Sequence, residues 1–360
     1  MRPKALYVHI PFCTSKCHYC AFSVVTNSDH QEAYVQALRA EAQARGITKS
    51  QAIETLYIGG GTPSLLAPKL LEELMNSLPA AGEVTVEVNP EQVGKAYLQF
   101  LHTLGVTRVS MGVQTLSDAA LSTMNRQHSS RQVFEAMTLL AESPFSWNTD
   151  LILGLPGTTS ASMEKDLYRI LAFAPHHLSA YFLSIEPGTV LATMPFDEND
   201  EESVSLYRTF SRVLRDSGYE HEEISNWAKP GHACKHNLTY WHGEEYSGLG
   251  LGASSFEGQK LWSNTRNLRL YLEGNYVMET PIPLQHQEMA NLLLTTHTRT
   301  KNGLAWSALL PYISEEQLLQ LQSRSRSLSQ QGLVTTTETH LVLNEDAHPL
   351  HSAILKELLF

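Results

Sequence analysis

The sequence predicts an α/β fold in which a parallel sheet is covered by helices on its outer side. Six short stretches rich in apolar, β-branched and aromatic residues alternate with helical stretches over the first half of the chain. Polar residues and glycines follow the ends of these strands, and the carboxyl ends of parallel strands share one edge of a sheet. The alternation favours a curled or barrel-like sheet, although six units alone also allow an open doubly wound sheet.

The first strand is expected at Ala5–Ile10, and Pro11 ends it because proline cannot donate a ladder hydrogen bond. The other expected strands are Thr55–Ile58, Val84–Val88, Arg108–Met111, Asn148–Leu153 and His177–Leu183. The expected helices are His30–Gly46, Pro68–Leu78, Glu91–Leu104, Ser130–Ala141 and Ser160–Phe173. The first of these has apolar residues at helical spacing and a glycine at its end. Each strand together with its helix has the length of a crossover unit.

A chain of 360 residues suggests a large domain followed by a smaller one. We expect the barrel in residues 1–220, an extension rich in aromatic residues and histidine in 221–275, and a C-terminal domain in 280–360. Two prolines, Pro281 and Pro283, mark the last boundary. The elements expected in this domain are helices Gln285–His297, Glu315–Gln330 and Ala347–Leu359 and strands Val334–Thr336 and Leu341–Leu343.

The composition excludes some classes of protein. Lysine and arginine number 26 against 37 aspartates and glutamates, so the net charge is −11 and a broad nucleic-acid surface is not expected. Pro11 interrupts the N-terminal apolar stretch before it reaches the length of a signal peptide, and no run of 18 apolar residues exists. We therefore expect a cytoplasmic protein, whose reducing compartment suits exposed cysteines.

Three of the four cysteines, Cys13, Cys17 and Cys20, stand in a C-x3-C-x2-C spacing. Thiolates hold iron–sulfur clusters, and three of them leave the fourth iron of a cubane without a protein ligand. A zinc ion with His18 or His9 as fourth ligand is an alternative, but no second half of a structural zinc site follows. A disulfide framework does not suit so long a chain without a secretion signal. Inert cysteines would be scattered more evenly.

This cysteine motif, followed by an aromatic residue, resembles that of the radical S-adenosylmethionine (SAM) proteins. Further motifs follow one another as in the HemW-type heme chaperones, relatives of oxygen-independent coproporphyrinogen III oxidase: YVHIPFC, YIGGGTPSLL, VEVNP, RVSMGVQ, DLILGLPG, IEPGT, EISNWAKPG and HNLTYW. The resemblance implies a partial (βα)6 barrel and a C-terminal winged-helix-like α+β domain. It also implies a [4Fe–4S] cluster on the three cysteines, with SAM chelating the open iron.

The resemblance further implies which residues contact SAM. Three consecutive glycines after the second strand let a ligand approach the backbone, although an ordinary strand-to-helix turn would use glycine too. They do not form a G-x-G-x-x-G or G-K-[ST] motif. A charged residue in an apolar strand, such as Glu87, is costly to bury without a partner, but exposed polar residues are common. The expected SAM contacts are Tyr7, Tyr19, Gly60, Gly61, Thr62, Glu87, Gln114, Arg126 and Asp150.

The segment His236–Trp241 matches the H-N-x-x-Y-W motif of the heme chaperones. A neutral imidazole is a common axial haem ligand, and neighbouring aromatic rings could pack against a porphyrin. His236 is therefore the candidate haem ligand, although a single histidine is more often structural. Cys234 is either an alternative thiolate ligand or a small buried residue.

The decarboxylating relatives carry a fourth cysteine two residues after the third, where this chain has Phe22, and an additional N-terminal segment. Both differences favour a haem carrier, while a radical SAM enzyme acting on a porphyrin stays an alternative. The partners implied are haem as cargo, acceptor proteins such as respiratory enzymes, an electron donor such as flavodoxin or ferredoxin, and a transient membrane-protein partner. Nucleic acid is not expected.

The chain departs from the family pattern at several positions. His18 and Ala21 replace the usual proline and aspartate of the cysteine loop, and Asn125 stands where a glycine usually precedes Arg126. Ser254 occupies the position of a histidine. These departures leave the three cysteines and the expected SAM contacts unchanged.

Overall fold

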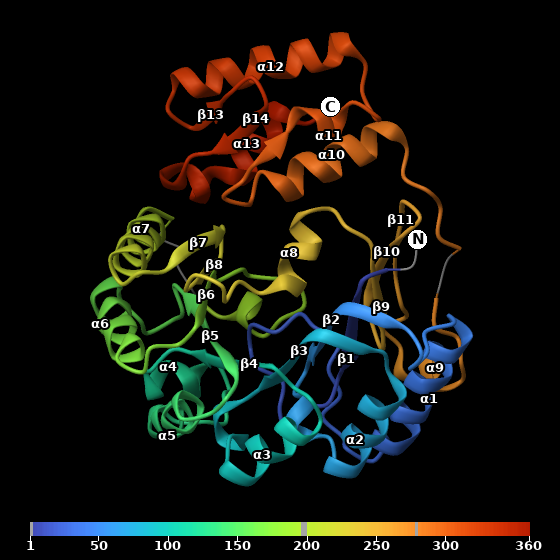
Figure 1. The fold of residues 1–360 in the computed structure, drawn as a ribbon. Coiled ribbons are helices and arrows are strands. Elements are labelled where there is room, and N and C mark those ends of the chain that lie inside the picture. Colours follow the sequence, from blue (N-terminus) through green and yellow to red (C-terminus); the bar gives the residue numbers. More distant parts are fainter. Residues whose placement is uncertain (1–2, 196–199, 278–279) are drawn as a thin grey trace.

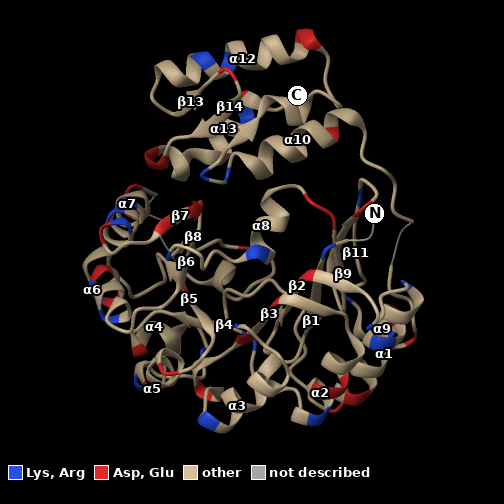
Figure 2. Cartoon of the chain, in the orientation of Figure 1, with Lys and Arg blue, Asp and Glu red and all other residues tan. Residues whose placement is uncertain are grey.

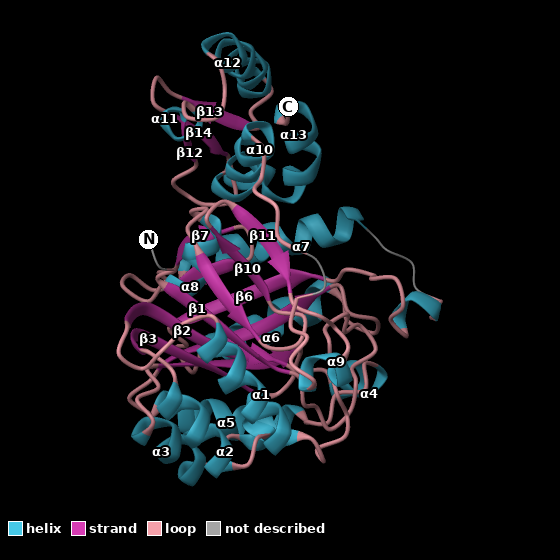
Figure 3. Ribbon diagram, turned by 90° about the vertical axis from the view of Figure 1, so that its right-hand side faces the viewer, coloured by secondary structure: helices cyan, strands magenta, loops and turns pink. Residues whose placement is uncertain are grey.

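The computed structural model describes residues 3–195, 200–277 and 280–360. Within these residues the chain forms an eleven-stranded sheet and a separate three-stranded antiparallel sheet. Helices surround the outside of the large sheet, and the C-terminal domain stands at one end of it (Figures 1 and 3).

All six expected strands of the barrel are present, and four of them are longer than the sequence predicts. They are β1 (Ala5–Ile10), β2 (Ala52–Gly60), β3 (Ala80–Val88), β4 (Arg108–Gln114), β5 (Ser146–Leu153) and β6 (His177–Phe182). The helices of this part are α1 (Gln31–Ala44), α2 (Pro68–Ser77), α3 (Lys95–Thr103), α4 (Asp118–Thr123), α5 (Ser130–Ala141), α6 (Ser160–Leu171) and α7 (Asp200–Asp216). Helices α4 and α7 had no counterpart among the expected elements.

Two expected helices, α3 and the last helix of the chain, begin about a full turn later than predicted, and each delay has a local cause. Residues Pro90–Gln92 form a separate 3-10 turn, and α3 begins after Gly94, which takes an extended N-cap conformation. The last helix of the chain also follows a 3-10 turn, Glu345–Leu350, which contains Pro349. Proline lacks the N–H that an α-helix interior needs, and it disfavours helical backbone in the preceding residue.

The strand order decides between the two sheet architectures that the sequence left open. Strands β1 to β6 lie side by side in chain order, and every neighbouring pair is parallel. A doubly wound sheet reverses its strand order at a switch point, whereas a barrel continues around in one direction. The six units therefore form the expected partial barrel. Helices α1 to α6 cover its outer side (Figure 1).

Residues 221–275 extend this sheet at both of its edges and do not stand apart from it. Beside β6 lie β8 (Asn226–Ala228) and β7 (Glu220–Glu223), and β8 is antiparallel to β6. Beside β1 lies β9 (Tyr246–Leu249), which is parallel to it. The remaining elements of the segment are β10 (Ser254–Glu257), β11 (Lys260–Ser263), α8 (Lys235–Trp241) and α9 (Leu268–Leu272). Helix α8 thus lies in the connection between the two edges.

The C-terminal domain has the expected α+β composition and a hydrophobic core of its own. Its elements are α10 (His286–His297), β12 (Leu304–Ala305), α11 (Trp306–Leu309), α12 (Glu315–Gln330), β13 (Val334–Thr336), β14 (His340–Leu343) and α13 (His351–Leu358). Ile224, from the turn between β7 and β8, is buried in this core, and Glu223 pairs with Arg299 at 3.0 Å. These contacts join the domain to the edge of the barrel.

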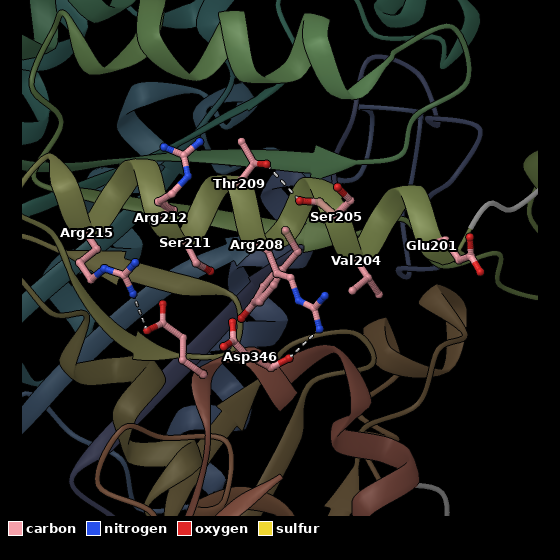
Figure 4. Close-up of a pocket in the computed structure, with 11 residues that line it drawn as sticks. Glu201, Val204, Ser205, Arg208, Thr209, Ser211, Arg212, Arg215 and Asp346 are labelled. Carbon is pink, nitrogen blue, oxygen red and sulfur yellow. Dashed lines mark hydrogen bonds and ion pairs between the residues drawn. The ribbon is translucent and has the colours of Figure 1, made fainter. Parts of the chain in front are cut away.

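Helix α7 provides a second contact with the C-terminal domain (Figure 4). Arg215 pairs with Glu345 at 3.3 Å, and Arg208 donates to the backbone carbonyl of Asp346 at 3.4 Å. Both arginines line a surface cavity of about 510 Å³. Because their guanidinium groups already have partners, this cavity is a domain contact rather than a free cationic site.

Charged residues of both signs are interspersed along the outer helices (Figure 2). Within the described ranges, no helix has both the length and the apolar composition needed to cross a membrane.

Candidate functional site

A cavity of about 510 Å³ opens where the carboxyl ends of β1 to β6 meet the loop that follows β1. This volume suits an ordinary small-molecule or cofactor site. Barrel folds place their chemistry at the same edge. Eleven of the thirteen residues proposed from the sequence line the cavity: Cys13, Cys17, Tyr19, Cys20, Gly60, Gly61, Thr62, Glu87, Gln114, Arg126 and Asp150.

The cysteine loop is held at both ends by backbone hydrogen bonds. The Cys13 amide donates to the Val25 carbonyl at 3.0 Å, and the Val25 amide donates to the Pro11 carbonyl at 2.7 Å. His9 reaches the exit of the loop, where its Nε2–H donates to the Ser23 carbonyl at 2.9 Å. The thiols are therefore presented from a loop whose path the barrel defines.

The far side of the loop rests on the end of α4. The His18 Nδ1–H donates to the Thr123 carbonyl at 2.7 Å, and Asn125 Nδ2 donates to the Lys16 carbonyl at 2.9 Å. Asn125 has φ +59°, a left-handed backbone that glycine and asparagine tolerate best. The replacement of the usual glycine by Asn125 thus keeps the backbone conformation and adds a bond to the loop.

Two of the three thiols face polar groups of the barrel edge. The Thr62 hydroxyl lies 3.7 Å from Cys13 Sγ, and Arg126 Nη1 lies 3.6 Å from Cys17 Sγ. Burial raises the pKa of the Cys13 thiol to about 11. Binding of iron would therefore release a proton from this thiol. In the described parts of the chain, no three His, Cys, Asp or Glu side chains are arranged around a single metal ion, but the thiolates of a cubane each bind a different iron.

Glu87 lies at the end of β3, and its two carboxylate oxygens are both engaged. Tyr57 donates its hydroxyl to Oε1 at 2.8 Å, and the Gly60 amide donates to Oε2 at 2.8 Å. Burial nevertheless raises the pKa of Glu87 to about 7, above the ordinary value of 4.5. A cationic ligand in the cavity would favour the ionised form of this carboxyl group.

Because Gly60 has no side chain, its backbone can come close to both Glu87 and His9. Its φ is +111°, and a Cβ there would lie 2.4 Å from the ring of His9. A residue with a side chain would therefore displace both the turn and the histidine that holds the cysteine loop.

Asp150, in β5, joins a chain of buried polar groups inside the barrel. Ser110 donates to Asp150 Oδ2 at 2.8 Å, and Asn148 Nδ2 donates to Oδ1 at 2.7 Å. His177 and Ser179 continue the chain on β6 through Asn148. Burial raises the pKa of Asp150. Around Asp150 the interior of the barrel is therefore polar. Such a lining is typical of a binding site and not of an apolar core.

Arg126 connects the ends of β3 and β4. Its Nη2 donates to Asn89 Oδ1 at 2.8 Å and to the Gly112 carbonyl at 3.0 Å, and its buried Nε has no hydrogen-bond partner. Gln114 has φ +66° where the β4–β5 register shifts. Such a backbone costs about 1–3 kcal/mol in a residue other than glycine, and such strain is concentrated at functional sites. The unpaired donor and the strained glutamine point to a ligand on this side of the cavity.

Tyr19 lies between the cavity and a small apolar cluster that includes Met124, Ile152 and Leu191. Burial raises the pKa of its hydroxyl, so Tyr19 stays neutral. It can therefore offer an aromatic face and a hydroxyl group to a ligand.

Two of the proposed residues, His236 and Tyr7, do not line this cavity. His236 is 1% exposed, its Nδ1 is bonded to the Thr55 hydroxyl at 2.8 Å and its Nε2 to the Tyr240 hydroxyl at 2.7 Å. Its ring stacks on Tyr57 with a centroid separation of 5.0 Å. Since both nitrogens are engaged and the ring is enclosed, His236 offers no free nitrogen to a haem iron in this structure.

Tyr7 also lies outside the cavity that contains the three cysteines, which we call the cofactor cavity. Its hydroxyl donates to His9 Nδ1 at 3.0 Å, and its ring packs near His236 at 6.5 Å. It lines a neighbouring cavity of about 490 Å³ instead of the one that holds the cysteines. Cys234 is buried at the start of α8, and burial raises the pKa of its thiol to about 12, as befits a small buried residue.

The structure adds residues that the list of predicted contacts omitted, chiefly Asn89, Gly112 and Tyr57. Asn89 links Thr62 to Arg126, and a Cβ at Gly112 would lie 2.8 Å from Gln114 Nε2 and 3.4 Å from Arg126. A glycine inside a strand pattern is the signal that could have identified Gly112. Tyr57 had no local signal, because only the parallel register places it beside Glu87.

The residues present fit a three-thiolate cluster with a cationic, donor-rich ligand beside it. Three cysteine thiols and the half-buried carboxyl groups of Glu87 and Asp150 line the cavity, and the buried Arg126 Nε has no hydrogen-bond partner among the described residues. Comparison with known proteins agrees. The Radical SAM superfamily model matches residues 7–169.

Three relatives illustrate the similarity over the rest of the chain. Heme chaperone HemW of Synechocystis is 35% identical, covering 88% of this chain and 82% of the relative. Heme chaperone HemW of Mycobacterium tuberculosis is 30% identical over 99% and 95%. The chain belongs to the HemW family. Radical S-adenosyl methionine domain-containing protein 1, mitochondrial, of Bos taurus is 32% identical over 92% and 81%.

Among solved structures, coproporphyrinogen III oxidase (HemN) of Escherichia coli has the same fold as this member of the HemW family. The TM-score is 0.82 and the identity 23%, covering 99% of this chain and 90% of that one. At this identity the likeness concerns the fold alone. It includes the C-terminal domain, which the family model does not reach.

Proposed function

We propose that this protein is a haem-binding chaperone that carries a [4Fe–4S] cluster on Cys13, Cys17 and Cys20 and binds SAM beside it. The observation that carries the proposal is the cavity at the barrel edge, which brings the three thiols together with Glu87, Asp150 and Arg126. The choice of haem as the cargo rests on the name of the relatives, heme chaperone. Haem would be passed to acceptor proteins such as respiratory enzymes.

The residues of the cavity divide the work of holding SAM. SAM is a cation with an amino group, a carboxylate and a nucleoside, so it needs acidic, basic and aromatic partners. Glu87 and Asp150 would meet the positive groups, Arg126 would meet the carboxylate, and Tyr19 would offer a ring. Gly61 and Thr62 would face the methionine part from the β2 turn. When bound and reduced, the cluster supplies an electron for the cleavage of SAM.

Phe22 bears on the choice between a carrier and an enzyme. It stands two residues after Cys20, where decarboxylating relatives have a fourth cysteine, and its side chain is exposed. A radical SAM enzyme that acts on a porphyrin is the alternative function. An electron donor such as flavodoxin or ferredoxin and a transient contact with a membrane protein belong to the proposal. A reducing, cytoplasmic compartment suits the exposed cysteine loop.

The test uses the full chain, reconstituted with iron and sulfide without air. We expect about four irons and four sulfides per chain, binding of one ferric haem, and transfer of that haem to an apo-haem protein. Incubation with SAM, a reductant and coproporphyrinogen III should leave the porphyrinogen unchanged. Protoporphyrinogen in the products would show that the protein is an enzyme and not a carrier. Bound zinc without sulfide would contradict the proposed iron–sulfur cluster.

A further inference from the structure

The second cavity, of about 490 Å³, lies beside the first and has walls of a different kind. They come from β1, the cysteine loop, α8, the strands β9 to β11 and helix α10 of the C-terminal domain. Six aromatic side chains line it: Tyr7, Phe22, Tyr240, Trp241, Tyr246 and Phe256. Aromatic walls provide large apolar surface and flat faces on which a planar ligand can stack.

Two residues of this second cavity, which we call the aromatic cavity, are exposed apolar side chains. Phe22 is 66% exposed and Leu261 is 47% exposed. Single exposed apolar residues are normal, but exposed apolar surface that is continuous with a cavity is typical of a ligand-binding or protein-binding site. Phe22 and Ala21 line both cavities, so a ligand in the aromatic cavity would lie next to the cysteine loop.

The aromatic cavity contains a charged side chain of each sign, Arg266 and Glu244. Arg266 lines it and forms no ion pair within the described residues. Glu244 also lines it and lies near the ammonium group of Lys4. The first cavity contains more acidic than basic side chains, among them Glu87 and Asp150, so it suits a cation better than the two carboxylates of a haem.

From these observations we propose that the aromatic cavity is the haem site, an inference that rests on the proposed carrier function. Haem is a flat apolar ring with two carboxylate groups at one edge. Its ring would lie against Phe22, Trp241 and Tyr246, and a carboxylate would pair with Arg266. Haem and SAM would then occupy adjacent cavities on either side of the cysteine loop.

The proposal explains the place of the H-N-x-x-Y-W motif without an iron–His236 bond. His236 holds Tyr240 through a 2.7 Å hydrogen bond, and Tyr240 and Trp241 are walls of the aromatic cavity. The motif would then serve haem by shaping the cavity. The Trp241 ring also packs against Arg299, whose guanidinium carbon lies 4.3 Å from the ring centre, and α10 adds Leu292 and Thr296 to the lining.

The test is a titration of the full chain with ferric haem, followed by the absorbance of the bound haem. Arg266→Ala should weaken binding about two- to fivefold, the usual effect of one exposed ion pair. Its matched control is Arg269→Ala, which removes a nearby exposed arginine that does not line the aromatic cavity. The dimethyl ester of haem, which has no carboxylate, should bind the wild-type and Arg266→Ala proteins equally.

The apolar contact is tested separately, because a charge change alone could act at long range. Phe22→Ser and Leu261→Ser should each weaken haem binding about tenfold through the loss of buried apolar surface. Leu319→Ser, at a leucine of α12 that is 62% exposed and does not line the aromatic cavity, is the control. Affinity for SAM should be unchanged in Arg266→Ala and Leu261→Ser.

The outcomes separate this inference from the proposed function. A wild-type protein that binds no haem would remove the carrier function itself. A wild-type protein that binds haem, together with Arg266, Phe22 and Leu261 variants that bind it equally well, would leave the carrier function standing and overturn the aromatic cavity as its site.

Discussion

The two cavities lie side by side and share Ala21 and Phe22, yet they are built in different ways. The cofactor cavity takes its polar residues from successive strand ends, and these residues bind one another: Thr62 to Asn89, Asn89 to Arg126, and Arg126 to Gly112. The aromatic cavity has walls from both ends of the chain and depends on packing. The first is therefore a preorganised polar site, whereas the second is an apolar recess next to it.

This difference predicts different responses to substitution. In the polar cavity each residue also holds its neighbours, so a single change disturbs several contacts and its effects are not additive. In the aromatic cavity each wall contributes its own apolar surface, so losses should be roughly proportional to the area removed. Variants that damage one cavity and spare the other provide the clearest tests of this comparison.

The largest effect is expected from the cysteines. Cys17→Ser should abolish the cluster, because a cubane cannot be held stably by two thiolates from this loop. Iron and sulfide analysis after anaerobic reconstitution measures the loss. Cys234→Ser should keep the full iron content, because Cys234 is buried at the start of α8 away from the loop. If the Cys17→Ser protein binds haem with normal affinity, the two cavities bind their ligands independently of each other. Full iron content in Cys17→Ser would contradict the assigned ligands.

Gly112→Ala should weaken SAM binding about tenfold, since a Cβ at this position would push against Gln114 and Arg126 and disturb hydrogen bonds to a charged group. Equilibrium binding of SAM measures the change. Gly94→Ala is the matched control, because no atom lies within 4 Å of its Cβ position. Haem affinity should stay the same in both variants. An equal loss of haem affinity in Gly112→Ala would mean that the cavities are coupled.

His236→Gln should lower the free energy of unfolding by about 1–2 kcal/mol, because it weakens the buried hydrogen bonds to Thr55 and Tyr240. Chemical denaturation measures this cost. The absorbance maximum of bound ferric haem should stay at its wild-type position, because both ring nitrogens of His236 are already engaged in hydrogen bonds. A folded His236→Gln protein with a shifted maximum would restore this histidine as the axial ligand.

The smallest effect is a pH dependence carried by Glu87. Because burial raises the pKa of its carboxyl group to about 7, affinity for the SAM cation should rise about threefold between pH 6 and pH 8 as Glu87 ionises. The stability of the protein without SAM should change in the opposite direction. Between pH 4.5 and pH 7 the folded state binds more protons at Glu87 than the unfolded state does, so the Glu87 contribution to stability falls as the pH rises.

Glu87→Gln is the control for both measurements. It keeps the size of the side chain and removes its charge, so the dependence of SAM affinity on pH and this part of the stability change should disappear. An unchanged pH profile in Glu87→Gln would assign the titration to another group, of which Asp150 is the nearest candidate because burial raises its pKa as well.

The sequence by itself determined the periodic elements and the residues that stand next to them in the chain. Alternating strand and helix patterns predicted all six strands of the barrel, and the end of each strand marked most of the polar cavity, because parallel strands place their carboxyl ends together. The cysteine spacing likewise indicated three thiols that belong together, and all three line the polar cavity. In each case the signal lies within a few residues of the chain.

Only the tertiary structure decided the features that depend on long-range contact. Strand order distinguished the partial barrel from a doubly wound sheet, and it placed β9 against β1 and β8 against β6. The same packing enclosed His236 between Thr55 and Tyr240 and placed Tyr7 in the aromatic cavity. The sequence of a histidine motif is the same whether the histidine ring is free or buried. The difference comes from side chains on other strands, up to 181 residues away in the chain, and no local pattern reports them.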